Sequence, residues 1–431
     1  MPVRLDRSSA DFTKRFADFL VMKREVSADI EAATRLIVDD VASRGDLALI
    51  EATRKFDRLD LDPSRLRVGA AEIDAAVQAC DRPTLDALEF ARDRIESFHR
   101  RQLPKDERFT DALGVELGWR WTSIESVGLY VPGGTAAYPS SVLMNAVPAK
   151  VAGVGRVVMV VPSPDGRLNP LVLAAAHLSG VSEIYRVGGA QAVAALAHGT
   201  ATIAPVAKIV GPGNAYVAAA KRLVFGKVGI DMIAGPSEVL VIADATGNAA
   251  WIAADLLAQA EHDVNAQSIL ITDDAALAAD VERAVEAQLA TLPRADIARA
   301  SWNDFGAVIL VRTIGESVSL ANAIAAEHLE IMTADPEALS AQIRNAGAIF
   351  LGAHTPEAIG DYVGGSNHVL PTARSARFSS GLGVLDFMKR TSILKCGPDQ
   401  LRELGPAAMT LGNAEGLDAH ARSVGLRLNL P

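Results

Sequence analysis

The sequence has few of the residues that mark disulfide scaffolds or nucleic-acid binders. Cys80 and Cys396 are its only cysteines, and two thiols so far apart fit a reducing compartment better than a disulfide framework. Aromatic residues make up 5% of the chain and the formal net charge is -10. The scarcity of aromatic rings disfavours stacking on single strands, and the negative charge disfavours nucleic acid and anionic membrane surfaces as partners.

Long hydrophobic runs are also missing. Lys150 and Arg156 interrupt the most apolar stretch, which is therefore too short to span a bilayer. The first residues lack the basic-then-apolar order of a signal peptide. We therefore expect a soluble, cytoplasmic protein. With 431 residues, 49% hydrophobic and 22% charged, it should be a globular protein of two or more domains.

The remaining pattern is α/β. Strand-like runs at 127–131, 157–161, 184–187 and 207–210 each precede a helical stretch, and a second such series has strands at 238–243, 267–272, 307–312, 329–333 and 348–351. Repeated βα units favour parallel sheets with right-handed crossovers. We predict two doubly wound, Rossmann-like parallel-sheet domains, with a helical N-terminal arm over residues 1–25 and a small C-terminal tail domain over 382–431. The first domain would combine 26–129 with 238–381, and 130–237 would form the second.

One acid and one base are adjacent in the sequence. Glu327 and His328 stand at an expected helix-to-strand junction, and such a pair suits proton transfer to and from a substrate. A helix near 249–262 places Asp255, Gln259 and His262 on one face. That pattern also describes an ordinary polar helix end, where a histidine interacts favourably with the helix dipole.

Further nitrogen and oxygen donors occur downstream. Asp361 and His368 flank a Gly-Gly-Ser-Asn turn, and Glu415 precedes His420 in the tail. A set of oxygen and nitrogen ligands without thiolate suits Zn²⁺ or a similar divalent ion. Any one of these segments alone is equally typical of a solvated turn.

Three glycine turns offer backbone N–H groups to an anionic cofactor. They follow Tyr130, Val187 and Val210, and each opens an expected helix. The third, Gly211-Pro-Gly213-Asn214, has Asp231 twenty residues after Gly211, as in a dinucleotide-binding fingerprint. The third glycine of that fingerprint is missing, so such turns can also be architectural.

Taken together and in order, eight segments resemble the histidinol dehydrogenase family. They are Tyr130-Val-Pro-Gly-Gly134, Val187-Gly-Gly-Ala-Gln191, Gly211-Pro-Gly-Asn214-Ala-Tyr, Ala234-Gly-Pro-Ser237-Glu-Val-Leu, Gln259-Ala-Glu-His262-Asp, Ala326-Glu327-His328-Leu-Glu, Gly364-Gly-Ser-Asn-His368-Val-Leu-Pro-Thr and Gly416-Leu-Asp-Ala-His420. No functional position within them departs from the family pattern.

The resemblance implies roles for these residues. It implies one Zn²⁺ held by Gln259, His262, Asp361 and His420, and an acid/base pair of Glu327 and His328. It places NAD at Tyr130, Gln191 and Asn214. It places the substrate at Ser237, Gln259, His262, His328, Asp361, His368, Glu415 and His420. It also implies a homodimer in which each C-terminal tail enters the partner's active site.

The reaction that follows is the NAD-dependent oxidation of L-histidinol to L-histidine through the aldehyde. His328 would remove the hydroxyl proton as hydride leaves, and Glu327 would then activate water to hydrate the aldehyde. One alternative is a relative acting on another small alcohol, such as a sulfonated propanediol, although an anionic sulfonate would want a cation where Glu415 lies. Another is a metal-binding protein without catalysis, which the intact Glu327 and His328 disfavour.

Overall fold

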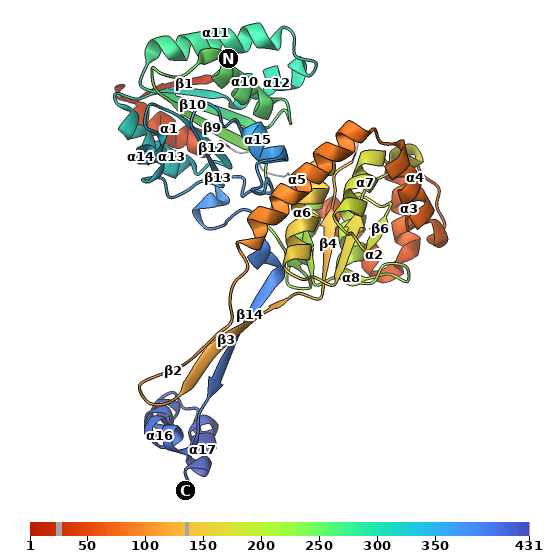
Figure 1. Cartoon of the computed structure of the whole chain (residues 1–431), viewed down its shortest axis with the longest axis vertical. Coiled ribbons are helices and arrows are strands. Elements are labelled where there is room, and N and C mark those ends of the chain that lie inside the picture. The colour runs from red at the N-terminus through yellow and green to blue at the C-terminus, as the bar shows by residue number, and fades with distance from the viewer. Residues whose placement is uncertain (23–27, 134–137, 431) are drawn as a thin grey trace.

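The computed structural model describes residues 1–22, 28–133 and 138–430. It has two α/β lobes and a long arm that ends in a pair of helices (Figure 1). One lobe is built on a six-stranded parallel sheet and the other on a five-stranded parallel sheet. The prediction of an α/β protein with two parallel sheets is confirmed.

The five-stranded sheet has the order β6-β5-β4-β7-β8. Its strands are β4 (Ser126–Tyr130), β5 (Arg156–Val160), β6 (Glu183–Tyr185), β7 (Lys208–Val210) and β8 (Gly229–Ile230). The helices between them are α6 (Pro139–Val151), α7 (Pro170–Leu178), α8 (Gly189–His198) and α9 (Ala215–Val224). The chain leaves β4 toward β5 and later returns beside β4 as β7, so the strand order reverses between β4 and β7, the position at which open α/β sheets generally bind ligands.

The N-terminal helices cover this five-stranded sheet. They are α2 (Ala28–Arg44), α3 (Asp46–Asp57), α4 (Ala70–Ala79) and α5 (Arg82–Arg100). One face of the sheet is covered by α4 to α7, and the other by α2, α3, α8 and α9 (Figure 1). The sequence pattern predicts that residues 26–129 belong to the other lobe. Helical periodicity identifies an amphipathic face but not the sheet on which that face packs, so the packing differs from the expectation.

The six-stranded sheet has the order β1-β11-β10-β9-β12-β13. Its strands are β1 (Val3–Asp6), β9 (Glu238–Ala243), β10 (Gln267–Thr272), β11 (Ala307–Leu310), β12 (His328–Met332) and β13 (Ala348–Leu351). One face carries α10 (Ala249–Ala260), α11 (Ala275–Leu289) and α12 (Ala295–Phe305), and the other carries α1 (Phe12–Leu20), α13 (Ser317–Ile324) and α14 (Pro336–Ser340). A short helix, α15 (Glu357–Tyr362), follows β13. From β9 onward, the sheet repeats the strand order of the five-stranded one.

The prediction of an N-terminal helical arm over residues 1–25 is wrong. Residues Val3–Asp6 form the edge strand β1, which pairs with β11. The following helix α1 buries Phe12, Phe16 and Phe19 in the core of the same lobe. Three phenylalanines on one helical face supply enough apolar surface to dock the segment on the sheet, so it does not extend as an arm.

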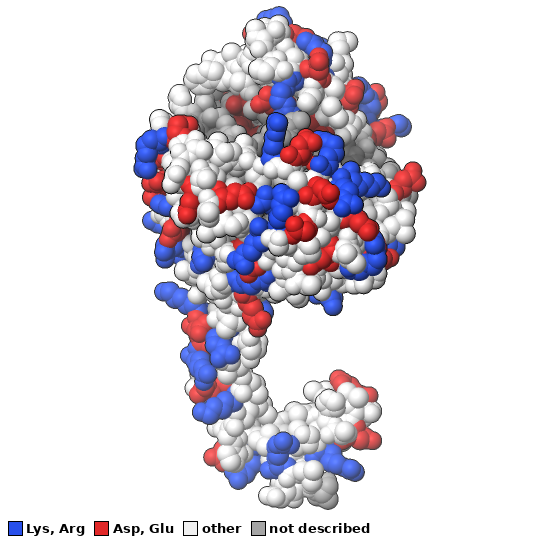
Figure 2. All heavy atoms as spheres, turned by 90° about the vertical axis from the view of Figure 1, so that its right-hand side faces the viewer, with Lys and Arg blue, Asp and Glu red and all other residues white. Residues whose placement is uncertain are grey.

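The arm is formed by two distant parts of the chain. Strand β14 (Met388–Lys395) pairs antiparallel with β3 (Glu116–Ser123), which pairs with β2 (Glu107–Thr110). Beyond β14 the chain forms α16 (Pro398–Ala414) and α17 (Asp418–Arg427), which pack on each other at the far end. In Figure 2 charges of both signs are spread over the surface above the arm, and both signs also occur at its tip among uncharged residues.

Within the described residues, no helix is long and apolar enough to cross a membrane.

Candidate functional site

The acid/base pair lies at the amino edge of the six-stranded sheet. His328 is the first residue of β12, and Glu327 directly precedes it after α13 ends at Ile324. The helix-to-strand junction expected from the sequence is therefore confirmed. The edge differs from the usual one, because open α/β sheets generally bind ligands at the carboxyl ends of their strands.

Residues of both lobes meet beside this edge. The Nε2 atom of His368 lies 3.3 Å from Oγ of Ser141, near the start of α6 in the five-stranded lobe. Asn367 donates from Nδ2 to the carbonyl of Met144 in the same helix at 2.6 Å. Since α6 follows β4, the carboxyl edge of one sheet faces the amino edge of the other.

His328 has one nitrogen engaged and one unsatisfied. Its Nδ1 lies 3.2 Å from the backbone carbonyl of Glu238, which can only accept, so Nδ1 carries the proton of a neutral ring. The Nε2 atom is buried and makes no hydrogen bond among the described residues. It lies 3.6 Å from Oδ1 of Asp361. This arrangement leaves Nε2 as the nitrogen that can accept a proton.

Three carboxylates surround the His328 ring. Glu327 and Glu357 lie 3.8 and 3.6 Å from Nδ1, and Asp361 faces Nε2. Burial alone would lower the pKa of His328, but the charges of Glu357, Glu327 and Asp361 outweigh it and raise the pKa well above the ordinary value. Loss of negative charge from this cluster would therefore lower the pKa of His328, so that more of it would be unprotonated and able to accept a proton at neutral pH.

Glu327 is held in an environment that favours its protonated form. Its side chain accepts the N–H of Glu238 at 2.9 Å. Burial raises its pKa to about 7, against the opposing effect of the His328 charge. A carboxyl group with a pKa close to neutral can both give and take a proton, as general acid/base catalysis requires.

Two of the expected zinc ligands lie on helices that are in contact, Gln259 on α10 and Asp361 on α15, and the charge of a third, His262, acts on Asp361. Gln259 is the penultimate residue of α10 and is 1% exposed, and its Oε1 is buried without a hydrogen-bond partner in the described part of the chain. Asp361 stays ionised: burial would raise its pKa, but its closeness to Nε2 of His328 and the charges of His328, His368 and His262 hold the pKa below the ordinary value. A buried amide oxygen without a partner and an ionised carboxylate are both ligand types that suit a divalent cation.

A second donor set shares Asp361. Ligand atoms of His328, Glu357 and Asp361 lie within 4.8 Å of one another, close enough to surround a metal ion. The two sets differ in what remains for catalysis, because an ion bound to His328 would remove the proton acceptor described above. The set of Gln259, His262 and Asp361 leaves His328 available.

The expected substrate contacts are partly assembled. His368 is held by Nδ1 against the backbone carbonyl of Asp361 at 3.0 Å, and burial lowers its pKa, so the ring is neutral. Ser237 immediately precedes β9 and is half-buried. Both residues therefore lie beside the edge that carries Glu327 and His328.

Glu415 and His420 are not part of this cluster within one chain. Glu415 follows α16 and His420 lies in α17, at the far end of the arm (Figure 1), and both are exposed. Several leucines around them are also exposed, including Leu411 at 63% and Leu426 at 66%. A surface with this much exposed apolar area on one small element is typical of an interface.

The residues expected to bind NAD lie at the carboxyl edge of the five-stranded sheet. Tyr130 ends β4, and its hydroxyl accepts the N–H of Gly189 at 3.0 Å. Gln191 is buried in the first turn of α8. Asn214 caps α9, since its Oδ1 accepts the N–H of Tyr216 and Val217. Gly134 lies outside the described residues.

The resemblance to a dinucleotide fingerprint at Gly211 and Asp231 is misleading. The carboxylate of Asp231 accepts the N–H of Gly211 at 2.7 Å and pairs with Lys221, both side chains being almost fully buried. Asp231 therefore stabilises the turn, and its carboxylate is not directed at a ribose. Gly211 has φ of 108°, and a Cβ there would lie 2.2 Å from the carbonyl oxygen of Tyr130, so the turn requires glycine.

Sequence reasoning missed two buried acids next to His328. Glu357 was not identified, and nothing in its local sequence marks it. Glu330 stands two residues after His328 in β12, where alternate side chains share a face. That alternation was sufficient to place Glu330 on the same side of the sheet.

Comparison with known proteins agrees with the geometry. The sequence model described as histidinol dehydrogenase matches residues 21–428. The chain is 84% identical to a histidinol dehydrogenase of Bradyrhizobium diazoefficiens and 81% identical to one of Rhodopseudomonas palustris, in each case over 100% of both chains. A crystal structure of histidinol dehydrogenase from Elizabethkingia anophelis superposes with a TM-score of 0.94 at 36% identity, covering 99% of this chain and 98% of the other.

Proposed function

The chain belongs to the histidinol dehydrogenase family, and from that premise we propose that it oxidises L-histidinol to L-histidine through L-histidinaldehyde, the last step of histidine biosynthesis. Each oxidation sends one hydride to NAD⁺, and water supplies the second oxygen of the carboxylate. We place this reaction in the cytoplasm. Identity of 84% over the full length supports histidinol as the substrate over a sulfonated propanediol.

The observation that carries the mechanism is the orientation of the His328 ring. With Nδ1 directed at the Glu238 carbonyl and Nε2 buried without a partner among the described residues, Nε2 takes the proton of the substrate hydroxyl as hydride leaves the carbinol carbon. The carbonyl of Glu238 fixes the tautomer in which Nε2 is the acceptor.

Glu327 serves the second oxidation. Its carboxylate removes a proton from water as the water adds to the aldehyde, and the resulting hydrate then donates the second hydride. A pKa of about 7 keeps a large fraction of Glu327 ionised at neutral pH, so the group can accept this proton and later release it. Its hydrogen bond to the backbone of Glu238 holds the carboxyl group in place between the two steps.

The proposed metal ligands are Gln259, His262 and Asp361 of one chain and His420 of the other. When bound, Zn²⁺ would hold the nitrogen atoms of the substrate and offset the charge of Asp361. With one carboxylate of the cluster neutralised in this way, the pKa of His328 falls toward the range in which it accepts protons. His368 and Glu415 would contact the substrate, together with Ser237.

The arm supports a homodimer with shared sites. Glu415 and His420 lie at its exposed tip, away from the other site residues of the same chain (Figure 1). In a symmetric dimer each arm reaches the partner's site. The NAD would lie across the carboxyl edge of the five-stranded sheet, against Tyr130, Gln191 and Asn214.

One assay tests the proposed function. Purified protein is incubated with L-histidinol and NAD⁺, and NADH is followed by absorbance before and after chelation and after Zn²⁺ is restored. Two NADH per histidinol, lost with the metal and recovered with Zn²⁺, is the expected result. One NADH per histidinol, or no NADH at all, would contradict the four-electron reaction.

A further inference from the structure

The helix α15 carries the two acids that flank the proton acceptor. Glu357 is its first residue, and its Oε1 lies 3.6 Å from Nδ1 of His328. Asp361 lies one turn later, with Oδ1 at 3.6 Å from Nε2. The helix has only six residues, and its N-cap Pro356 offers no side-chain hydrogen bond. A helix this short has no stability of its own, so contacts from outside must fix its position.

A buried acid holds its amino end. Oε1 of Glu330 accepts the backbone N–H of Glu357 at 2.7 Å, and Glu330 is 1% exposed. The other oxygen of this carboxyl group, Oε2, is buried without a hydrogen-bond partner in the described part of the chain.

The surroundings of Glu330 favour its protonated form. Burial raises the pKa of Glu330, and the charge of Asp255 in α10 raises it further. In either protonation state a carboxyl oxygen can accept a hydrogen bond, so the contact from Oε1 to the N–H of Glu357 does not depend on ionisation.

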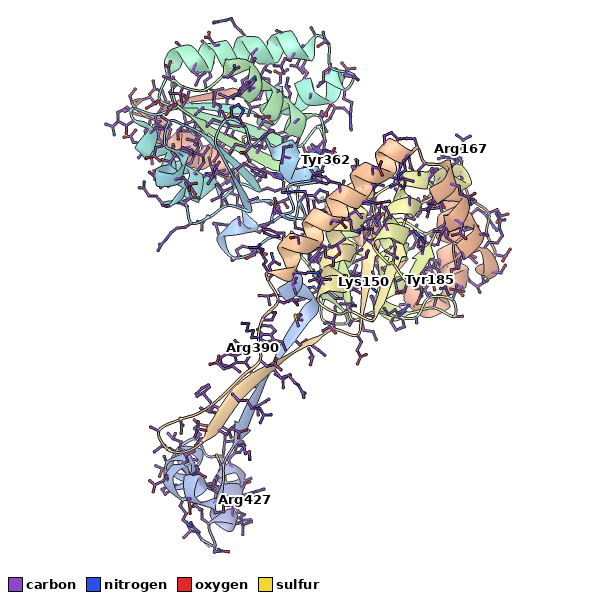
Figure 3. The ribbon with its side chains drawn as sticks, viewed as in Figure 1. Lys150, Arg167, Tyr185, Tyr362, Arg390 and Arg427 are labelled. Carbon is purple, nitrogen blue, oxygen red and sulfur yellow. The ribbon has the colours of Figure 1, made fainter. Side chains whose placement is uncertain are left out.

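A cation from the other lobe holds the carboxyl end. Arg94 of α5 donates from Nε to the carbonyl of Val363 at 2.5 Å and from Nη2 to that of Gly364 at 3.1 Å. These carbonyls directly follow Tyr362, the last residue of α15, which Figure 3 shows on the side of its lobe toward α5. An arginine at the last carbonyls of a helix satisfies acceptors that would otherwise lack partners.

We propose that Glu330 and Arg94 are positioning residues that hold α15 at its two ends and so set Glu357 and Asp361 against His328. The inference rests on the proposed function, in which Asp361 binds the metal and His328 takes the proton. Arg94 adds a link between the lobes, since it ties the helix that carries a metal ligand to the lobe proposed to bind NAD.

Glu330 is tested with a pair of variants of similar size. Glu330→Gln keeps a carbonyl oxygen for the N–H of Glu357 in a side chain of the same size, so kcat should stay within about threefold of wild type. Glu330→Leu removes the acceptor. We expect kcat to fall by about 10–100-fold and the Kd for Zn²⁺, measured on metal-free protein by competition with a chelator, to rise by about 10-fold or more.

The role of Arg94 is tested against another arginine of α5 that lacks its contacts to α15. Arg94→Met keeps most of the apolar stem and removes both hydrogen bonds, and it should weaken Zn²⁺ binding by about 10-fold. Arg82→Met removes the same charge at the first residue of the same helix, where Arg82 is exposed and pairs with Asp86 of its own helix. It should leave both the Kd for Zn²⁺ and kcat unchanged.

The outcomes separate the positioning role from the proposed function. Wild-type Zn²⁺ affinity in Glu330→Leu and Arg94→Met would overturn the proposal, as would a Glu330→Gln variant as damaged as Glu330→Leu. If Glu330→Leu does not fold, judged by circular dichroism, then Glu330→Gln and Arg94→Met still decide it. If the wild-type protein forms no NADH from histidinol, the proposed function fails, while Zn²⁺ titration of the same variants still measures positioning.

Discussion

Replacing Glu327 by glutamine should stabilise the metal-free protein at alkaline pH, at the expense of its catalytic role. The carboxyl group is buried, and burial raises its pKa from 4.5 to about 7. The hydrogen bond from the Glu238 N–H survives in the variant, because the glutamine carbonyl accepts it equally well. The change therefore removes the cost of ionising a buried acid while keeping its contact.

The sign and size of the effect follow from linkage. For an acid with a raised pKa in the folded state, the folded chain binds the proton more tightly than the unfolded chain. The loss of folding stability caused by ionising Glu327 is absent below about pH 4. It grows as the pH rises from 4.5 to 7 and reaches its full size above pH 7. At about 1.4 kcal/mol for each pH unit, the shift in pKa corresponds to roughly 3 kcal/mol at pH 8 and under about 1 kcal/mol at pH 5.

Thermal unfolding followed by circular dichroism measures this difference. At pH 8 the midpoint of metal-free Glu327→Gln should exceed that of wild type by roughly 5 °C, and at pH 5 the two should nearly coincide. The exposed Glu107 in β2 provides a matched control, and Glu107→Gln should leave the pH dependence unchanged. A gain of equal size at both pH values, or a loss at pH 8, would show that Glu327 does not carry this ionisation cost.

The remaining predictions concern catalysis and assembly. His328→Ala should slow oxidation of histidinol by about 10²–10⁴-fold, whereas Glu327→Gln should slow oxidation of the aldehyde more than that of the alcohol; equal losses on both substrates in both variants would mean that the roles are wrongly assigned. His262→Asn should bind less than one Zn²⁺ per chain yet unfold at the wild-type temperature, as measured by metal analysis and calorimetry, since the side chain is exposed. Mixed His262→Asn and His420→Asn chains should recover about a quarter of the wild-type activity, because random pairing makes half of the dimers hybrid and each hybrid has one intact site of two; inactive, verified hybrids would reject shared sites.

Much of the fold could be predicted from the sequence because its signals are local. The predicted strands at 238–243, 267–272 and 348–351 have the bounds of β9, β10 and β13. Buried parallel strands form continuous apolar runs, and glycine or polar turns separate them from helices. The strands of the arm were missed, because β2 has only four residues, all exposed, and β3 is mostly half-buried and interrupted by Glu116 and Arg120.

The motifs identified the family and the adjacent acid and base for the same reason. Glu327 and His328 are neighbours in the chain, and their junction between helix and strand is a local property. The sequence also showed that Gln259 and His262 share a helix end. What these side chains can do chemically follows from their residue types, so an acid/base and metal chemistry could be inferred without a structure.

Only the tertiary structure decided how the distant segments meet. It placed the pair at the amino edge of its sheet, brought Glu357 and Asp361 to 3.6 Å from His328, and used Asp231 to brace a glycine turn. It also placed His420 in α17, at the far end of the arm. Sheet order, the choice of surface on which a helix packs, and the burial that shifts a pKa depend on contacts between residues far apart in sequence, and a local pattern contains no information about those contacts.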